Sequence, residues 1–326
     1  MRLTPFTLWS ITAGLGIGSL YAALRTTTPP HPEGSVESKA LSTGREYVLA
    51  HRGRPGAPVV IALHGAGETV DDFRALSGYR LEQLAREHAF TLAYGVGIGR
   101  TFNDSRNPLP YKARKRRADD VAYLQEIVTD LRPQQGSTLL GIGYSNGAHL
   151  LLRAATDAPG LFDGIAISGA SLAKGSPPPT QAVSMVQLAG TRDLLSPVEG
   201  GSPRLLSRLL GPTVQAETTA KTIADVAKAD LVEHRSIPGR CPIDLTHWAG
   251  SHHHVWFYRA HGAGHTFPVP NAARARLYGR QPDLDFPHVS LFHLGALADS
   301  TSRCEGDSRS DSIAQPQPAP DASDTS

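Results

Sequence analysis

Three side chains in this sequence could together carry out nucleophilic catalysis, and they occur in the order Ser145, Asp193 and His265. A serine hydroxyl becomes a nucleophile when a histidine takes its proton and a carboxylate orients that histidine. Each of the three residues lies within three positions of a glycine, in the segments G-Y-S-N-G, G-T-R-D and G-A-G-H-T. We therefore predict that Ser145, Asp193 and His265 form a catalytic triad.

The serine has the local context of a nucleophile on a tight turn. An apolar run typical of a buried strand, residues 137–142, precedes it, and a helical pattern, residues 148–155, follows it. The bare pattern G-x-S-x-G fixes only three positions and by itself indicates no more than a glycine-rich turn. The change from strand to helix predicts in addition a strained turn that presents the Ser145 hydroxyl at a helix N-terminus.

Glycine-rich loops follow three further apolar runs. The segment His64-Gly65-Ala66-Gly67 comes directly after the run 58–63, where backbone N–H groups unobstructed by side chains could stabilise an oxyanion. Asp193 and His265 come after the runs 185–188 and 255–258. Each loop alone is equally typical of an ordinary turn, so the catalytic interpretation depends on their combination and order.

The elements around these loops alternate between apolar strands and amphipathic helices. Such alternation predicts an α/β fold with a mostly parallel sheet and helices on both faces. Active residues then collect beyond the carboxyl ends of the strands, and the order Ser, Asp, His is that of the α/β-hydrolase fold. The expected strands cover residues 46–49, 58–63, 90–94, 137–142, 165–167, 185–188 and 255–258, and the expected helices cover 73–85, 119–131 and 217–229.

Composition and charge exclude several classes of protein. The formal net charge of +2 over 326 residues gives no indication of nucleic-acid binding. The basic run 112–117 is typical of a solvated loop, which could favour acidic substrates if it lies at the rim of a site. The histidines at 252–254 alternate in direction along an extended segment, so they do not predict a metal site. We expect no metal and no cofactor.

The two ends of the chain differ from its middle. Residues 1–25, with Arg2 before an uncharged apolar stretch, are typical of a signal peptide, with an uncleaved membrane anchor as the alternative. We accordingly expect a secreted or periplasmic protein, or one held at a membrane. Residues 26–44 predict a flexible linker, residues 45–302 the catalytic domain, and residues 303–326 a disordered tail.

The motifs together resemble the polyhydroxybutyrate depolymerase and feruloyl/acetylxylan esterase group, secreted α/β-hydrolases akin to carbohydrate esterase family 1. The resemblance runs from about residue 46 to residue 268. It is carried by the segments H-G-A-G-E-T at 64–69, D-D-F at 71–73, G-R-T-F-N at 99–103, D-D-V at 119–121, G-Y-S-N-G at 143–147, G-T-R-D at 190–193 and G-H-T-F-P at 264–268.

The resemblance implies an esterase that forms an acyl-enzyme on Ser145. It implies oxyanion donors from the backbone of Ala66 and Asn146, and a substrate cleft lined by Arg100, Phe102, Asn103 and Phe267. The family often has tryptophan where Phe102 and Phe267 stand, so the substrate is left open between polyhydroxybutyrate oligomers and feruloyl or acetyl esters of polysaccharides.

The two cysteines, Cys241 and Cys304, give a weak indication of a disulfide in an exported protein. The resemblance matches Cys241 to a family cysteine whose usual nearby partner is missing here. It therefore implies Cys304 as the partner.

Two alternatives to a secreted serine esterase are compatible with the sequence. A serine peptidase of the prolyl oligopeptidase type would use the same triad, although such enzymes usually carry a large accessory domain. A non-catalytic binding protein on a hydrolase scaffold is the other, although such proteins usually lose a triad member. The sequence does not predict an oligomeric state.

Overall fold

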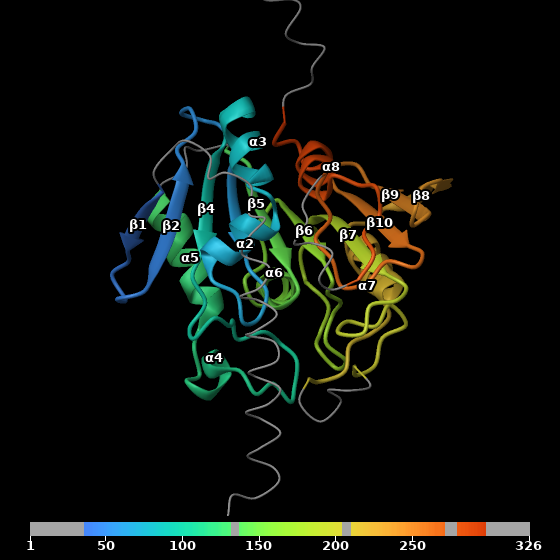
Figure 1. The fold of residues 1–326 in the computed structure, drawn as a ribbon, viewed down its shortest axis with the longest axis horizontal. Coiled ribbons are helices and arrows are strands. Elements are labelled where there is room, and N and C mark those ends of the chain that lie inside the picture. The colour runs from blue at the N-terminus through green and yellow to red at the C-terminus, as the bar shows by residue number, and fades with distance from the viewer. Residues whose placement is uncertain (1–35, 132–136, 204–209, 271–278, 298–326) are drawn as a thin grey trace, which may run out of the picture.

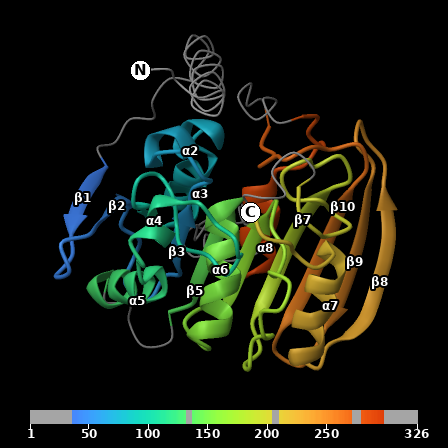
Figure 2. The same ribbon diagram turned by 90° about the horizontal axis from the view of Figure 1, so that it is seen from below.

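A computed structural model describes residues 36–131, 137–203, 210–270 and 279–297 of the chain (Figure 1). One ten-stranded sheet, in the order β1-β2-β4-β3-β5-β6-β7-β10-β9-β8, runs through the molecule. β1 and β8 form its two outer edges (Figure 2). The strands are β1 (Glu37–Ala40), β2 (Glu46–His51), β3 (Val59–Leu63), β4 (Thr91–Gly95), β5 (Leu139–Tyr144), β6 (Gly164–Ser168), β7 (Ser184–Gly190), β8 (Asp230–Ile237), β9 (Ile243–Ala249) and β10 (His254–Ala260).

The six central strands are parallel to one another, in the order β4, β3, β5, β6, β7 and β10. Each strand outside them is antiparallel to its neighbours in the sheet. Central parallel strands are buried on both faces, which requires continuous apolar runs. The sequence V-V-I-A-L of β3 meets this requirement, and all five of its residues are buried. The predicted α/β class, with a mostly parallel sheet and helices on both faces, is confirmed.

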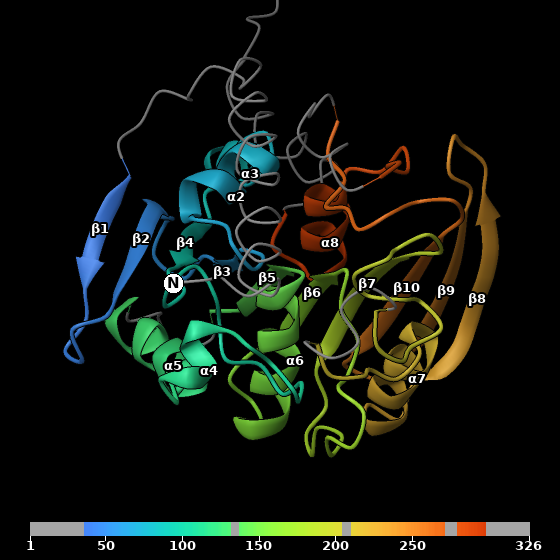
Figure 3. The ribbon, with the colours of Figure 1, turned by 60° about the horizontal axis from the view of Figure 1, so that its bottom comes forward.

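Helices cover the two faces of the sheet in separate layers (Figure 3). On one face, α2, α3 and α8 pack over a core that includes Phe73, Leu84 and Phe286; on the other, α5, α6 and α7 pack over a core that includes Leu124, Leu151 and Ile223. The helices are α2 (Val70–Leu76), α3 (Arg80–His88), α4 (Lys112–Lys115), α5 (Asp120–Leu131), α6 (Asn146–Asp157), α7 (Ala216–Val226) and α8 (Phe286–His293).

The single helix expected over residues 73–85 is wrong, because the chain forms α2 and α3 there. The break lies at Gly78 and Tyr79, both of which have a positive φ of 57°. A left-handed residue ends the hydrogen-bond ladder of a helix. The apolar spacing continues across the break because both helices face the same core, so periodicity could not reveal it.

The sequence prediction also omitted α8 and the hairpin of β8 and β9. Most residues of β8 are exposed, so this strand lacks the alternation of apolar and polar residues that marks a half-buried strand. The basic run 112–117, expected as a loop, contains the short helix α4.

β1 corrects the expected linker over residues 26–44. Glu37–Ala40 pairs with the first four residues of β2 as an antiparallel edge strand. Three of its four residues are exposed, so its polar sequence does not distinguish it from a linker. The expected signal peptide, residues 1–25, and the expected tail, residues 303–326, lie outside the described residues. Within the described ranges, no helix has the length and apolar character needed to cross a membrane.

Candidate active site

Ser145 lies between the end of β5 and the start of α6. Its backbone has φ 52° and ψ −114°, a conformation that residues other than glycine rarely adopt. Residues held in such sparsely populated regions cost on the order of 1–3 kcal/mol and cluster at functional sites. The turn is held by the Ser145 N–H, which donates to the Ser168 carbonyl at 2.8 Å, and by the Gly147 N–H, which donates to the His64 carbonyl at 3.1 Å.

The two glycines of the G-x-S-x-G segment allow the turn to pack closely. A Cβ atom at Gly147 would lie 2.5 Å from the backbone oxygen of Leu63 on β3. A Cβ at Gly143 would lie 2.7 Å from the backbone nitrogen of Ala148. Both contacts involve backbone atoms that cannot rotate away, so any side chain would push α6 off the sheet. The tertiary structure therefore requires glycine at the positions that the motif fixes.

Asp193 and His265 meet at the same edge of the sheet. Asp193 follows β7 and His265 follows β10, two parallel neighbours whose carboxyl ends lie side by side. His265 Nδ1 lies 2.7 Å from Asp193 Oδ2, and both side chains are buried. The other oxygen, Oδ1, accepts the N–H groups of Leu195 at 2.8 Å and Ser196 at 2.7 Å. These contacts hold the carboxylate in one orientation toward the imidazole.

His265 also lies beside the turn that carries Ser145. Its imidazole is 5.1 Å, between ring centroids, from the ring of Tyr144, whose hydroxyl donates to the His265 carbonyl at 3.0 Å. On the other side, a Cβ at Gly169 would lie 2.7 Å from His265 Cε1, so only glycine leaves room for this ring. Contacts between a catalytic serine and histidine often tighten only when substrate binds.

The order of the strands, the strained turn at Ser145 and the succession Ser, Asp, His at carboxyl ends of strands are the defining features of one fold. The chain has the α/β-hydrolase fold.

Comparisons with known proteins agree with this α/β-hydrolase assignment. No family model matches the chain. The putative esterase NocK of Nocardia uniformis subsp. tsuyamanensis is 27% identical over 263 residues, which cover 70% of this chain and 75% of NocK. The resemblance to an α/β-hydrolase esterase group is thus confirmed at that level.

Two solved structures illustrate the range of similar hydrolases. An acetyl xylan esterase from Aspergillus awamori is 15% identical with a TM-score of 0.49, over 73% of this chain and 96% of the esterase. A predicted CIB-like hydrolase from Thermoplasma acidophilum is 11% identical with a TM-score of 0.45, over 80% of this chain and 97% of that hydrolase.

The loop expected to supply oxyanion donors follows β3 at the same edge. Ala66 and Gly67 are exposed, whereas His64 and Gly65 are buried. His64 Nδ1 donates to the Gly65 carbonyl at 2.7 Å, and His64 Nε2 accepts the Gly97 N–H at 3.1 Å. Burial lowers the pKa of His64 to about 4, so the ring stays neutral and keeps this pair of contacts at neutral pH.

The two expected donor groups are the backbone N–H groups of Ala66 and Asn146. Asn146 is the first residue of α6, where a backbone N–H has no partner inside the helix. Neither the N–H of Ala66 nor that of Asn146 donates a hydrogen bond to any described part of the chain. Both groups therefore retain the capacity to bind an oxygen atom of a ligand.

The expected substrate-binding residues differ in their exposure to solvent. Arg100 is exposed, with a positive φ of 63°. Asn103 is buried, and its amide donates to the Ala118 carbonyl at 2.7 Å. Phe102 and Phe267 are fully buried, so neither ring is exposed to a ligand in this structure, and their expected role in the substrate cleft stays a prediction. Phe267 packs within a cluster of aromatic rings below the site, where it supports Tyr144.

The buried polar residues Asp104, Arg106 and His149 were not predicted as part of the site. Asp104 and Arg106 form an ion pair at 2.7 Å with both side chains buried, and Asn146 Nδ2 donates to Asp104 at 2.8 Å. A charged residue two positions from its partner is common in loops, so the sequence pattern N-D-S-R gave no specific signal. His149 lies one helical turn after Ser145 on α6.

His149 should make the stability of the fold depend on pH. Burial, and then the nearby charge of Arg106, lower the pKa of this histidine from 6.5 to about 3. Below pH 6.5 the unfolded chain binds a proton that the folded chain excludes, so stability is full above that pH and falls as the solution becomes more acidic. We expect His149→Gln to reduce the slope of unfolding free energy against pH by about 1.4 kcal/mol per pH unit between pH 6 and 4.

Urea denaturation of both proteins at a series of pH values measures this slope. The exposed His252 provides the control, and His252→Gln should keep the slope of the unchanged protein. Equal slopes for His149→Gln and the unchanged protein would contradict the prediction.

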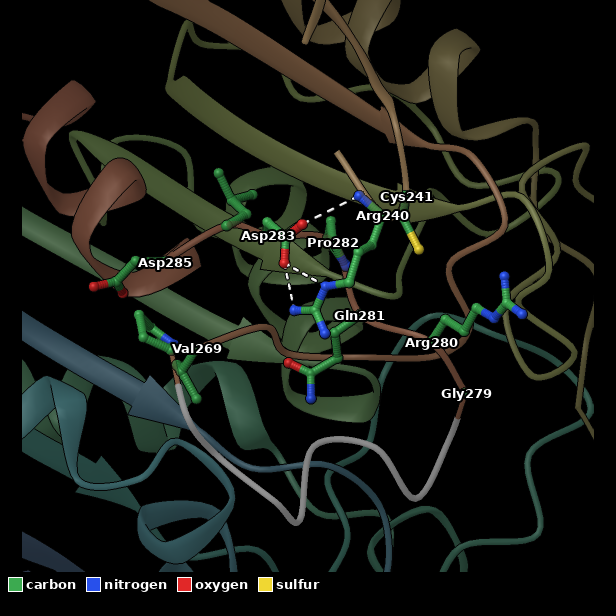
Figure 4. Close-up of a pocket in the computed structure, with 11 residues that line it drawn as sticks. Arg240, Cys241, Val269, Gly279, Arg280, Gln281, Pro282, Asp283 and Asp285 are labelled. Atoms are coloured by element: carbon green, nitrogen blue, oxygen red, sulfur yellow. Dashed lines mark hydrogen bonds and ion pairs between the residues drawn. The ribbon is translucent and has the colours of Figure 1, made fainter. Parts of the chain in front are cut away.

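A large cavity, about 940 Å³, lies next to the loop that carries His265 (Figure 4). Its lining includes Arg240 and Asp283, which form an ion pair, and Arg280, whose carbonyl accepts the Gly264 N–H at 3.0 Å. In Figure 4 the guanidinium of Arg280 extends away from that ion pair. No member of the expected triad is among the described lining residues, so the cavity borders the site without containing its chemistry.

Cys241 lies in the lining of the same cavity with a free, buried thiol. Burial raises the pKa of this thiol, which disfavours the reactive thiolate. Cys304 lies outside the described residues, so the disulfide between the two cysteines stays a prediction. In the described ranges no group of three or more His, Cys, Asp or Glu side chains is arranged to hold a metal ion.

Proposed function

We propose that the protein is a serine esterase that hydrolyses carboxylic esters through an acyl-enzyme. The observation that carries this proposal is the strained Ser145 turn beside an imidazole already hydrogen-bonded to a buried carboxylate, at 2.7 Å. Strained backbone is retained where function depends on it. The similarity to NocK, named as a putative esterase, supports the ester as the bond that is cleaved.

In the proposed mechanism, His265 takes the proton of Ser145 as the hydroxyl oxygen attacks the ester carbonyl carbon. The carbonyl π bond opens, and the N–H groups of Ala66 and Asn146 bind the resulting oxyanion, each lowering the barrier by about 3 kcal/mol. When the oxyanion collapses, the bond to the alkoxy oxygen breaks and His265 gives its proton to the leaving alcohol. Water, with His265 again as base, then releases the acid from the acyl-enzyme.

Asp193 acts in this mechanism by fixing the imidazole. Its carboxylate accepts the Nδ1–H of His265, so that Nε2 is left as the basic nitrogen, and its negative charge stabilises the imidazolium that forms in each step. The two backbone N–H groups that Asp193 Oδ1 accepts keep the carboxylate from rotating away.

The substrate classes that we propose are polyhydroxybutyrate oligomers and feruloyl or acetyl esters of polysaccharides. The motif resemblance supports both classes of ester. We also propose that the enzyme is exported, because residues 1–25 have the composition of a signal peptide. No partner other than the ester substrate is implied.

A panel of substrates tests the proposal: p-nitrophenyl acetate, hydroxybutyrate trimer, methyl ferulate, acetylated xylan and a peptide p-nitroanilide. We expect hydrolysis of the aryl ester and of at least one natural ester class, and none of the anilide. Cleavage of the anilide faster than any ester would favour a peptidase. No turnover together with no covalent labelling of Ser145 by a fluorophosphonate would favour a binding protein.

A further inference from the structure

The loop of residues 97–104 connects the two proposed oxyanion donors, which belong to different elements. At one end its Arg100 carbonyl accepts the Gly67 N–H at 2.8 Å, directly after Ala66. At the other end the Phe102 N–H donates to Asn146 Oδ1 at 2.7 Å, and Asn146 Nδ2 donates back to the Phe102 carbonyl at 3.0 Å. We call this segment the bridging loop.

The end of the bridging loop at Asn146 is anchored by Asp104. Asn146 Nδ2 donates to Asp104 Oδ2 at 2.8 Å, and Arg106 reaches the same oxygen with Nη2 at 2.7 Å. The Arg106 N–H donates to Asp104 Oδ1 at 2.9 Å, and Arg114 Nη2 donates to the Asp104 carbonyl at 2.8 Å. Burial of the Asp104 carboxyl opposes its ionisation, but the Arg106 charge outweighs it and lowers the pKa, so the carboxylate stays charged.

Both donors depend on this loop for their position. Ala66 is exposed, and two hydrogen bonds between Gly65 and Glu68 close its turn, from the Gly65 N–H to Glu68 Oε2 at 2.8 Å and from the Glu68 N–H to the Gly65 carbonyl at 3.3 Å. The hydrogen bond from the Gly67 N–H to the Arg100 carbonyl joins this turn to the bridging loop. Asn146 is the first residue of α6, and three hydrogen bonds hold its side chain while its backbone N–H has no partner inside the helix. Oxyanion donors stabilise a transition state only where their geometry is set before the reaction.

We propose that the Asn146 side chain and Asp104 are positioning residues that align the Ala66 and Asn146 N–H groups through the bridging loop. The inference rests on the proposed esterase function. Neither side chain touches the reacting atoms. Because an oxyanion exists only in the transition state and the tetrahedral intermediates, loss of alignment should lower kcat and leave KM nearly unchanged.

Asn146→Ala tests the inference most directly, because it keeps the backbone N–H and the ion pair of Asp104 with Arg106 while removing the three side-chain hydrogen bonds. With p-nitrophenyl acetate we expect kcat to fall about 100-fold, the cost of a misplaced catalytic group, and KM to change less than twofold. The affinity for phenyl trifluoromethyl ketone, which forms a tetrahedral adduct with an oxyanion, should fall by the same factor as kcat.

Asp104→Asn is the second variant and should show the same pattern, with a smaller fall in kcat because the contacts to Phe102 remain. Glu82→Gln is the matched control, since Glu82 forms an equally buried ion pair with Arg74 at 2.7 Å and contacts neither the bridging loop nor Asn146. The control should lower the melting temperature and leave kcat and ketone affinity unchanged.

The outcomes separate this inference from the function on which it rests. An unchanged protein that neither hydrolyses esters nor reacts with a fluorophosphonate overturns both. An active unchanged protein whose Asn146→Ala variant keeps kcat and ketone affinity overturns only the positioning role. Equal losses of kcat in Asn146→Ala and Glu82→Gln would likewise overturn it, because general loosening of the fold would then account for the effect.

Discussion

Ser145→Ala is expected to reduce kcat for p-nitrophenyl acetate by at least about 10⁴-fold, the scale on which loss of a triad nucleophile acts. Without the hydroxyl oxygen no acyl-enzyme can form, and the oxyanion donors and bound water supply only residual catalysis. The measurement is steady-state hydrolysis of the purified variant, together with mass spectrometry of both proteins after treatment with a fluorophosphonate. The label should appear on Ser145 of the unchanged protein and be missing from the variant.

The fold should survive this change, because the hydrogen bonds that hold the turn come from the backbone N–H groups of residues 145 and 147. Alanine must still adopt the positive φ of 52°, so we expect a small fall in melting temperature and an unchanged circular dichroism spectrum. Turnover within tenfold of the unchanged protein would show that Ser145 is not the nucleophile.

Asp193→Asn should reduce kcat by roughly 10⁴-fold while the protein remains folded. An asparagine amide has one oxygen, which accepts hydrogen bonds, and one nitrogen, which donates them. The N–H groups of Leu195 and Ser196 require an acceptor at the position of Oδ1, so the amide oxygen would lie there and the amide nitrogen would face His265 Nδ1 as a donor. That contact favours the tautomer with the proton on Nε2, and the imidazole then cannot accept the proton of Ser145.

A second aspartate at the same edge of the sheet provides the matched control. Asp244 Oδ2 lies 2.6 Å from His261 Nε2, so Asp244→Asn changes an aspartate–histidine pair of the same kind outside the expected triad. We expect its kcat to stay within twofold of the unchanged value. Losses of similar size in both variants, or a loss below tenfold in Asp193→Asn, would argue against the assigned role of Asp193.

The central part of the fold could be predicted because its physical requirements are local. β3 and β5 must be apolar on both faces, and the helix after Ser145 must carry an apolar face, so composition and periodicity mark all three. The peripheral elements could not be predicted in this way. β8 is exposed along most of its length, and the break between α2 and α3 depends on backbone angles at Gly78 and Tyr79.

The residues of the candidate site also differ in how far the sequence alone could predict their placement. Ser145, Asp193 and His265, the proposed triad, stand in glycine-rich segments after apolar runs, so residue type and order were enough to propose them from the sequence. Phe102 and Phe267 were predicted as substrate contacts from the resemblance alone. Both are fully buried, and this depends on how neighbouring segments pack over them.

The sequence by itself determined the α/β class, the order of the proposed triad and the loops in which its members lie, because short segments carry that information. Only the tertiary structure decided that His265 meets Asp193, that Gly169 makes room for the imidazole, and that Asp104 joins Asn146 to the bridging loop. These contacts join residues 42 to 96 positions apart along the chain, from the pair Asp104 and Asn146 to the pair Gly169 and His265. Contacts of this kind depend on which strands become neighbours in the sheet, and no local pattern encodes them.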